Sequence, residues 1–221
     1  MVFSYFSGGI NMPLFMGSLS TSEILDQSQD KQRIVIAGSS GTFEVATLIL
    51  HVLRQLKRPC DYVLSRPPEG QTSSVHVSDA PVLIVDQPIA DSVPLDWHHH
   101  IAVLTGFDAH ATSEESLIRS FDAFADATPK SGILIYNESD RILTVICTKE
   151  RPDVLYVPFK SHPHHEESGN TYLVAGSKER GPFSLSGKEP LLYVSAAKET
   201  LKKIGVTSEL FYQALQGFRF R

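Results

Sequence analysis

The 221-residue sequence is short of several residue types, and each shortage disfavours a class of protein. Its two cysteines, Cys60 and Cys147, lie far apart and match neither a disulfide framework nor a zinc-binding pair. The 20 Lys and Arg do not outnumber the 25 Asp and Glu, so a nucleic-acid partner is disfavoured. This composition fits a reducing, cytoplasmic setting best.

The sequence also lacks long apolar runs. A membrane-spanning helix needs about 20 consecutive apolar residues, and no stretch reaches that length. The most apolar stretch, MVFSYFSGGINMPLFMG (1–17), lacks the basic start of a signal peptide and is interrupted by Gly8, Gly9 and Pro13. We therefore expect no membrane partner, and we expect residues 1–28 to form a packed N-terminal arm.

Strand-like and helix-like segments alternate over residues 29–221, which favours a mostly parallel sheet with helices on both faces. RIVIA (33–37) is apolar on both sides, as a central parallel strand is, and apolar residues recur at helical spacing from Val45 onward. Further strands are expected at DYVL (61–64), APVLIVD (80–86), HIAVLTG (100–106), GILIYN (132–137) and RILTVIC (141–147).

Three helices and a small sheet are expected in the rest of the chain. TSEESLIRSFDAFADAT (112–128) has Thr112 and Glu115 at capping-box spacing. YVSAAKETLKKIG (193–205) and TSELFYQALQG (207–217) end in glycines that suit helix C-termini. Short β segments predict an antiparallel sheet at the edge of the main one: VLYVPF (154–159), TYLVAG (171–176) and GPFSLSG (181–187). The predicted fold class is three-layer α/β with this small addition.

Residues 34–53, IVIAGSSGTFEVATLILHVL, have the outline of a phosphate-binding loop. In such a loop, backbone N–H groups and a helix N-terminus hold phosphates, a lysine neutralises their charge and a hydroxyl binds magnesium. Gly38, Ser39, Ser40 and Gly41 keep the backbone turn, but Thr42 stands where the lysine should be. The phosphate loop is therefore degenerate.

The next two residues depart further from the pattern. Phe43 replaces the magnesium-binding hydroxyl, and Glu44 places a carboxylate in the first turn of the helix. Carboxylates are stabilised at helix N-termini for the same electrostatic reason as phosphates. We therefore expect Glu44 to satisfy the helix end and to repel ATP.

Four stretches in order resemble the central, ATP-binding domain of the Mur ligases. They are AGSSGTFEVATLI (37–49), VLIVDQPIAD (82–91), IAVLTGFDAH (101–110) and SGKEPLLYVSAAKETLKKIGV (186–206). Mur ligases are cytoplasmic enzymes that build peptidoglycan precursors by joining amino acids or peptides to UDP-N-acetylmuramate. The likeness is greatest to the UDP-N-acetylmuramate:L-alanine ligase and the murein-peptide-recycling ligase, and it covers residues 29–221.

The resemblance implies a metal site that is only partly kept. Asp86 falls at the family's metal-binding glutamate, and His110 at its ligand histidine after a one-residue deletion. The alternative is that Asp86 is a polar residue at a strand end and His110 a loop residue. ATP and magnesium are the implied cofactors if the family's activity survives.

The family's adenine-side motif is lost more clearly. Gly187 aligns with its glycine, which puts Glu189 at the histidine and Pro190 and Tyr193 at the two asparagines. Proline has no N–H with which to contact a base, although it suits the first turn of a helix. The helix pattern is kept without its ligand-facing side chains, so no catalytic residue is assigned.

Two functions follow as expectations. The full enzymes carry an N-terminal UDP-sugar domain and a C-terminal ligase domain, and neither is expected within these 221 residues. The first function is an inactive relative that binds a ligand or a protein partner. The second is an ATP-dependent ligase component that a partner chain completes. Apolar residues near both ends, such as Phe15 and Phe220, could pack a second subunit of a homo-oligomer or a partner chain.

Two histidine-rich stretches, WHHH (97–100) and SHPHHEE (161–167), could bind metal, but both are expected to be loops. Successive residues of an extended segment point to opposite faces, which keeps His98, His99 and His100 from converging on one ion. Cys147 is expected to be a small core residue, and Cys60 has no activating base nearby in sequence.

Overall fold

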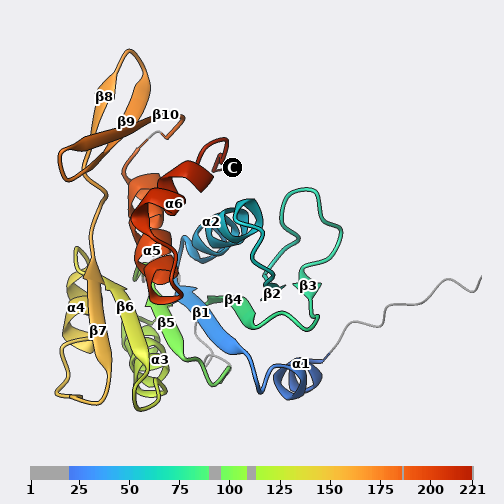
Figure 1. The fold of residues 1–221 in the computed structure, drawn as a ribbon. Coiled ribbons are helices and arrows are strands. Elements are labelled where there is room, and N and C mark those ends of the chain that lie inside the picture. Colours follow the sequence, from blue (N-terminus) through green and yellow to red (C-terminus); the bar gives the residue numbers. More distant parts are fainter. Residues whose placement is uncertain (1–19, 90–95, 109–112, 186, 221) are drawn as a thin grey trace, which may run out of the picture.

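The computed structural model describes residues 20–89, 96–108, 113–185 and 187–220. Its main sheet has seven strands in the order β3-β2-β4-β1-β5-β6-β7, which are parallel apart from β3 (Figure 1). The strands are β1 (Gln32–Gly38), β2 (Asp61–Val63), β3 (Val75–His76), β4 (Val82–Pro88), β5 (Ile101–Leu104), β6 (Ile133–Asn137) and β7 (Leu155–Phe159). A second, antiparallel sheet contains β8 (His164–Glu167), β9 (Asn170–Ala175) and β10 (Lys178–Phe183).

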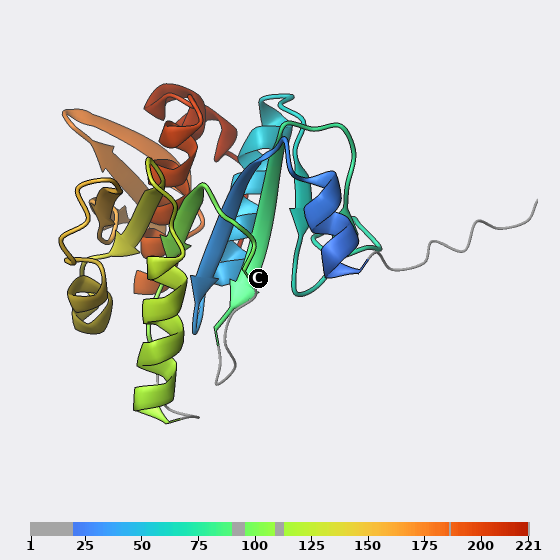
Figure 2. The ribbon, with the colours of Figure 1, turned by 90° about the horizontal axis from the view of Figure 1, so that it is seen from below.

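Helices cover both faces of the main sheet (Figures 1 and 2). One face packs against α2 (Thr42–Gln55), α5 (Lys188–Lys203) and α6 (Ser208–Ala214). The other packs against α1 (Thr21–Gln27), α3 (Glu114–Asp126) and α4 (Arg141–Ile146). In β1, Ile34 and Ile36 belong to the first core while Val35 and Ala37 belong to the second, and all four are fully buried. The predicted three-layer α/β fold is therefore confirmed.

The centre of the sheet is where the connections change direction. From β1 the chain passes to β2 and β4 on one side, and it then crosses to β5, β6 and β7 on the other. In open α/β sheets, ligands bind outside the carboxyl ends of the strands at such a switch point. The carboxyl end of β1 is Gly38, where the predicted phosphate loop begins.

One predicted strand is a helix. RILTVIC was expected to be extended, but residues Arg141–Ile146 form α4. Asp140 caps it by accepting hydrogen bonds from the amides of Ile142 and Leu143, at 3.0 and 3.2 Å. The prediction was wrong because β-branched residues favour strands, whereas an aspartate N-cap starts a helix.

The edge of the sheet also differs from the prediction. Residues Leu155–Phe159 were assigned to the small antiparallel sheet, yet they form β7, parallel to β6 in the main sheet. Residues His164–Glu167, expected to lie in a loop, form β8 and pair with β9. The small antiparallel sheet itself is confirmed.

The sequence predicted the existence of the helices better than the residues at which they begin. Ser113, and not Thr112, is the N-cap of α3; Thr112 lies outside the described residues. Within the predicted arm, α1 begins with a capping box between Ser20 and Glu23 that the sequence prediction missed. Residues 1–19, and with them Phe15, are outside the described part. No helix in the described residues is long and apolar enough to cross a membrane.

Candidate functional site

The turn between β1 and α2 is held by the end of β5. The Ser39 amide donates to the Gly106 carbonyl at 2.9 Å, and Thr105 Oγ1 donates to the Ser40 carbonyl at 2.6 Å. A side chain at Gly38 is impossible without movement, since an added Cβ would lie 2.2 Å from Thr105 Oγ1. The backbone of the predicted loop is therefore locked by neighbours from a distant part of the sequence.

Gly41 is the N-cap of α2 and adopts a left-handed conformation with φ +76°. A Cβ added there would lie 2.2 Å from Cε1 and 2.7 Å from Cζ of Tyr193, so the phenol ring packs directly on the glycine. Tyr193 reaches it from α5, and the Phe220 ring lies 5.7 Å from the Tyr193 ring. Phe218 follows, with its ring centroid 4.9 Å from that of Phe220. Tyr193 thus covers the glycine that a phosphate group would approach, and Phe220 and Phe218 continue the row of aromatic rings away from it.

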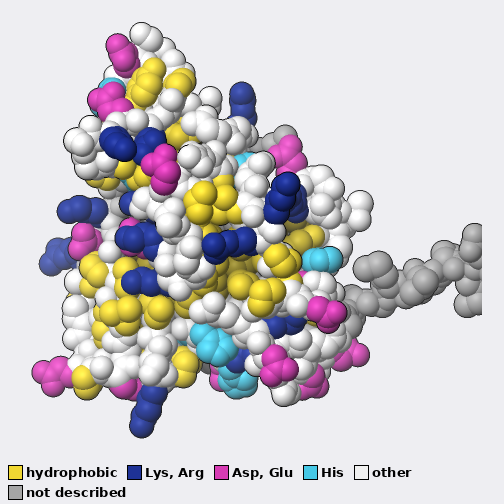
Figure 3. Space-filling model, in the orientation of Figure 1, with side chains coloured by type: hydrophobic (Ala, Val, Ile, Leu, Met, Phe, Trp, Pro, Cys, Tyr) yellow, Lys and Arg dark blue, Asp and Glu magenta, His cyan; other side chains and the backbone are white. Residues whose placement is uncertain are grey.

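Hydrophobic side chains are exposed in the middle of this face, with lysine and arginine side chains among them (Figure 3). A cavity of about 290 Å³ opens beside the aromatic row. Its lining includes Phe43, Glu44, Arg66, Phe218 and Phe220. The cavity is next to the loop, but it does not expose Gly41, because Tyr193 lies on that glycine.

The charges around Tyr193 are those of carboxylates. Burial, followed by the charges of Glu189 and Glu44, raises the pKa of Tyr193 to about 12, so the phenol is neutral at pH 7. The carboxylate of Glu44 lies 3.4 Å from Arg66, whose guanidinium stacks 4.1 Å above the Phe43 ring. Glu44 was expected to satisfy the helix end, but among the described residues the hydrogen-bond partner of its carboxylate is Arg66.

Thr42, at the lysine position of the loop, is buried with only 4% of its surface exposed. It supplies neither a positive charge nor a long side chain. Since a phosphate loop neutralises phosphate with its lysine and with N–H groups at the helix end, an ATP phosphate does not fit this arrangement.

Asp86 lies in β4 opposite Ile36 of β1, which places it at the crevice edge of the sheet. It is 6% exposed, and its Oδ2 accepts hydrogen bonds from Ser65, from the amide at 3.1 Å and from the hydroxyl at 2.5 Å. Oδ1 of Asp86 and Oγ of Ser39 are buried and have no hydrogen-bond partner in the described residues. The predicted role of Asp86 as a metal ligand stays a prediction.

His110, the second predicted metal ligand, lies outside the described residues. Within the described part of the chain, no group of three or more His, Cys, Asp or Glu side chains could hold a metal ion. Magnesium usually keeps several waters and binds through one or two carboxylates together with substrate phosphates, so Oδ1 of Asp86 would supply one oxygen ligand of such a centre. The metal-binding role of Asp86 and His110 therefore stays a prediction.

The helix that carries the lost adenine-side motif is well formed. Gly187 is the N-cap of α5, and Pro190 lies in its first turn. Ala196 and Ala197 are fully buried in the core beneath. The pattern was sufficient to predict the helix, but it gave no indication that Tyr193 would contact Gly41.

Other residues of the site were missed by sequence reasoning. Ser65 and Arg66 follow β2, whose carboxyl end lies at the same edge of the sheet as that of β1. That position was an available signal. Phe218 carried no signal at all, since it follows the last helix.

The histidine-rich stretches do not form metal sites in the described residues. His99 is buried beside Thr128, 3.0 Å from its Oγ1, and burial lowers the pKa of His99 to about 4. His162 is also buried, with Nε2 2.8 Å from the hydroxyl of Tyr212. Both side chains are buried, whereas the sequence predicted a solvated or interface loop for the first stretch and a flexible polar loop for the second.

A parallel sheet with a glycine turn at its switch point defines the class, an α/β fold of the phosphate-loop type. No known family profile matches the sequence, and no curated protein matches it either. Solved structures of Mur ligases do match its fold.

Three of these structures belong to three different Mur ligases. The UDP-N-acetylmuramate:L-alanyl-gamma-D-glutamyl-meso-diaminopimelate ligase from Neisseria meningitides is 16% identical, with a TM-score of 0.74 over 87% of this chain and 68% of that one. The MurF ligase from Thermotoga maritima, solved in complex with ADP, is 14% identical, with a TM-score of 0.68 over 90% of this chain and 52% of that one. The UDP-N-acetylmuramate-alanine ligase MurC from Thermotoga maritima is 12% identical, with a TM-score of 0.65 over 90% of this chain and 48% of that one.

The chain has the fold of the Mur ligases, as its sequence predicted. It spans about two thirds of the Neisseria ligase and about half of the two Thermotoga ligases.

Proposed function

We propose that this chain is a Mur-ligase-like domain of peptidoglycan synthesis that binds neither ATP nor magnesium by itself. It does not ligate alone, and it acts in the cytoplasm by binding a ligand or a protein partner. The contact between the Tyr193 ring and Gly41 carries this proposal.

The physical reason is steric first and electrostatic second. Phosphate loops work because a phosphate approaches glycine backbone closely and meets N–H groups at the helix N-terminus. The Tyr193 ring occupies that approach. The neutral phenol brings no positive charge, and the charges of Glu189 and Glu44 act on the same position.

The partner is a second copy of this chain or another chain that supplies further Mur domains. Phe220 packs within the chain against Tyr193. A partner that draws the C-terminal segment away from the loop would expose Tyr193, and it would link assembly to the state of the loop.

The alternative function is an active ligase component that a partner chain completes. The retained left-handed Gly41 and the locked turn below it favour this alternative. It requires Tyr193 to leave Gly41 when the partner binds.

Calorimetry with Mg-ATP tests the proposal. We expect no measurable heat of binding for the wild-type chain. A variant that combines Tyr193→Asn with Thr42→Lys, Phe43→Thr and Glu44→Thr should bind Mg-ATP, because it removes the ring and one carboxylate and adds the lysine and hydroxyl. Adding Gly41→Trp to this variant is the control and should abolish the binding.

Two results would contradict the proposal. Micromolar binding of Mg-ATP by the wild-type chain, lost on Gly41→Trp, would mean that the loop is functional despite its substitutions. Binding by Tyr193→Asn alone would mean that the ring is the only obstacle, which favours the partner-completed ligase.

A further inference from the structure

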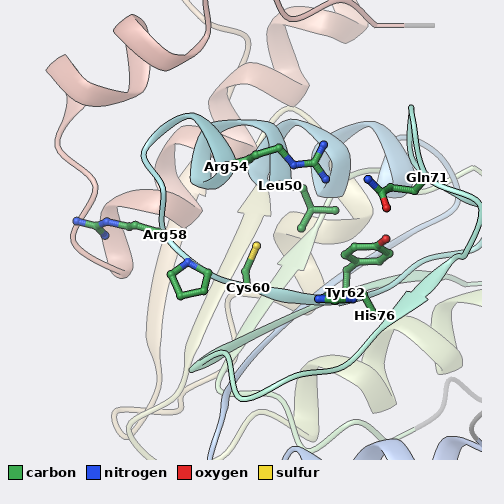
Figure 4. A pocket seen from close by; sticks show the side chains of 8 residues that line it. Leu50, Arg54, Arg58, Cys60, Tyr62, Gln71 and His76 are labelled. Atoms are coloured by element: carbon green, nitrogen blue, oxygen red, sulfur yellow. The ribbon is translucent and has the colours of Figure 1, made fainter.

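A second cavity lies at the other end of α2 (Figure 4). Its volume is about 320 Å³, and it is lined by Leu50, Arg54, Arg58, Pro59, Cys60, Tyr62, Gln71 and His76. Along α2, Leu50 lies about 14 Å and Arg54 about 20 Å from Gly41. The cavity is therefore separate from the degenerate phosphate loop.

The polar groups that line this cavity can donate hydrogen bonds, and its lining contains no Asp or Glu. Arg58 is partly committed, because its guanidinium donates to the carbonyls of Ile204 and Gly205 at 3.0 and 3.2 Å. Arg54 differs: among the described residues its side chain makes no hydrogen bond or ion pair, and it is exposed. A planar guanidinium without a partner is the group best suited to holding a carboxylate or phosphate.

The arrangement in Figure 4 directs Arg54 toward the cavity and Arg58 away from it. The Arg54 guanidinium extends along the helix toward the amide of Gln71, with the Tyr62 ring below. Burial raises the pKa of Tyr62, and the charge of Arg54 is the strongest influence that opposes this shift. The positive field of Arg54 therefore reaches the floor of the cavity.

Glu69 and Arg54 both line the adjoining cavity along α2, whereas the carboxylate beneath the floor of this cavity is already neutralised. Asp61 is fully buried, and its Oδ2 lies 2.9 Å from Lys31 Nζ. Its Oδ1 accepts a hydrogen bond from Ser78 Oγ at 2.6 Å and lies 4.0 Å from Nε2 of His76. Asp61 thus leaves the positive charge of Arg54 available to a ligand.

The walls supply an apolar surface beside these donors. The Tyr62 and His76 rings are stacked, with centroids 5.7 Å apart and planes 30° from parallel. Leu50 is 5% exposed and lies between Arg54 and Tyr62 (Figure 4). Pockets that bind small molecules combine such apolar walls with a few placed polar groups, at volumes of about 300–1,000 Å³.

We propose that this cavity binds a small organic anion, a carboxylate or phosphate monoester carried on a flat apolar body. Arg54 holds the oxyanion, the Gln71 side-chain amide donates a further hydrogen bond, and Leu50 contacts the apolar body. The Tyr62 hydroxyl donates to the Ser73 carbonyl at 3.4 Å, so Tyr62 contributes its ring. The site does not depend on the phosphate loop, so it stands whether or not the chain binds ATP.

Titration of the full chain with three probes, followed by NMR of backbone amides and by calorimetry, tests this site. The probes are phenyl phosphate, benzoate and benzamide, the last being a neutral analogue of benzoate. We expect saturable binding of the two anions, with shifts confined to residues around the cavity, and no saturable binding of benzamide. Benzamide binding as tightly as benzoate would overturn the anion site, and so would the absence of saturation by either anion.

Variants assign the binding to Arg54. Arg54→Gln should weaken binding of both anions about tenfold or more, since a hydrogen bond to a charged group contributes about 1.5–3 kcal/mol. Arg54→Lys should give an intermediate affinity, because it keeps the charge but loses the planar fork. Arg119→Gln is the control: Arg119 is an exposed residue of α3, on the other face of the sheet, that pairs with Glu115 at 2.9 Å.

Each outcome of the variants decides the assignment. An unchanged affinity in Arg54→Gln, in a protein with the wild-type thermal unfolding midpoint, would overturn the role of Arg54. An equal loss in Arg119→Gln would show a nonspecific charge effect and would also overturn it. The wild-type chain should bind the anions while giving no heat with Mg-ATP, which separates this site from the proposed function of the loop.

Discussion

The two ends of α2 differ in a way that the sequence did not predict. Its N-terminal end carries the glycine turn of a phosphate loop, but Tyr193 closes that end and the nearby Glu44 is paired with Arg66. Its C-terminal end carries no known motif, yet it borders an open cavity where Arg54 has no partner among the described residues. The sequence motif thus predicts a backbone conformation, whereas the accessibility of the site depends on the side chains that pack against it.

The largest effect is expected at the C-terminal end of α2, under the arginine-lined cavity. Lys31→Met would leave the buried Asp61 without its cation, and breaking a buried ion pair on one side costs about 3–5 kcal/mol. Urea unfolding should show that loss in the free energy of unfolding.

The matched control for this change is Lys149→Met. Lys149 also pairs with acids, at 2.7 Å from Asp122 and 2.8 Å from Asp126, but its side chain is 34% exposed. We expect a loss of at most about 1 kcal/mol there, as for surface pairs in general. Equal losses in the two variants would mean that the Lys31–Asp61 pair does not support the cavity floor.

The next largest effect on stability is expected at the N-terminal end of α2, where the Tyr193 ring packs on Gly41. Gly41 and Gly70 have nearly the same φ, +76° and +74°, but a Cβ at Gly70 meets nothing within 4 Å. Gly41→Ala should therefore destabilise the protein by about 1–3 kcal/mol more than Gly70→Ala, because overpacking is added to the same backbone strain. Thermal or urea unfolding of both variants measures this difference.

A double-mutant cycle tests whether the Tyr193 ring causes the additional destabilisation by Gly41→Ala. Combining Gly41→Ala with Tyr193→Ala removes the clash, so the excess cost of Gly41→Ala should disappear in the Tyr193→Ala background. If the excess persists there, a group other than Tyr193 closes the loop.

The smallest effect is a pH dependence from the same ring. The pKa of Tyr193 is raised from the model-compound value of 10.0 to about 12, so between these pH values the unfolded chain releases this proton while the folded chain keeps it. The folded state then binds more protons, and the stability must fall as the pH rises through this window.

In Tyr193→Phe, the free energy of unfolding should fall less steeply between pH 10 and pH 12 than in the wild type. Burial also raises the pKa values of Tyr212 and Cys147 to about 12 and that of Cys60 to about 11, and these groups contribute to a decline that both proteins share. Urea unfolding below pH 10 and again toward pH 12 measures the two slopes. Identical slopes in the wild type and the variant would show that Tyr193 is not desolvated by its contact with Gly41.

Much of the fold could be predicted because periodicity reflects burial directly. RIVIA is apolar on both sides and became β1, which is covered by helices on both faces. The strand prediction for RILTVIC was wrong because a seven-residue apolar segment with four β-branched residues is short enough to suit either structure, and the Asp140 side chain decided the outcome. Gly41 was predicted to lie in a turn, and its left-handed conformation agrees with that prediction.

The candidate site could be predicted only in part. Tyr193 was identified as a departure from the family's asparagine, but nothing in its sequence neighbours indicated the contact with Gly41. The Ser65 hydrogen bonds to Asp86 and the pairing of Arg66 with Glu44 likewise join residues 21 and 22 positions apart. Such contacts depend on how the strands and helices are packed and not on local spacing.

By itself, the sequence determined the fold class, most of the strands and helices, the glycine turn after β1 and the likeness to the Mur ligases, because these depend on local backbone preferences and on the burial pattern along the chain. Only the tertiary structure decided that an aromatic ring closes the loop and that Arg54 faces an open cavity. The reason is geometric: α5 and the C-terminal segment meet α2 from more than a hundred residues away in the sequence, so the neighbours of Gly41 exist only once the sheet and its helices have assembled.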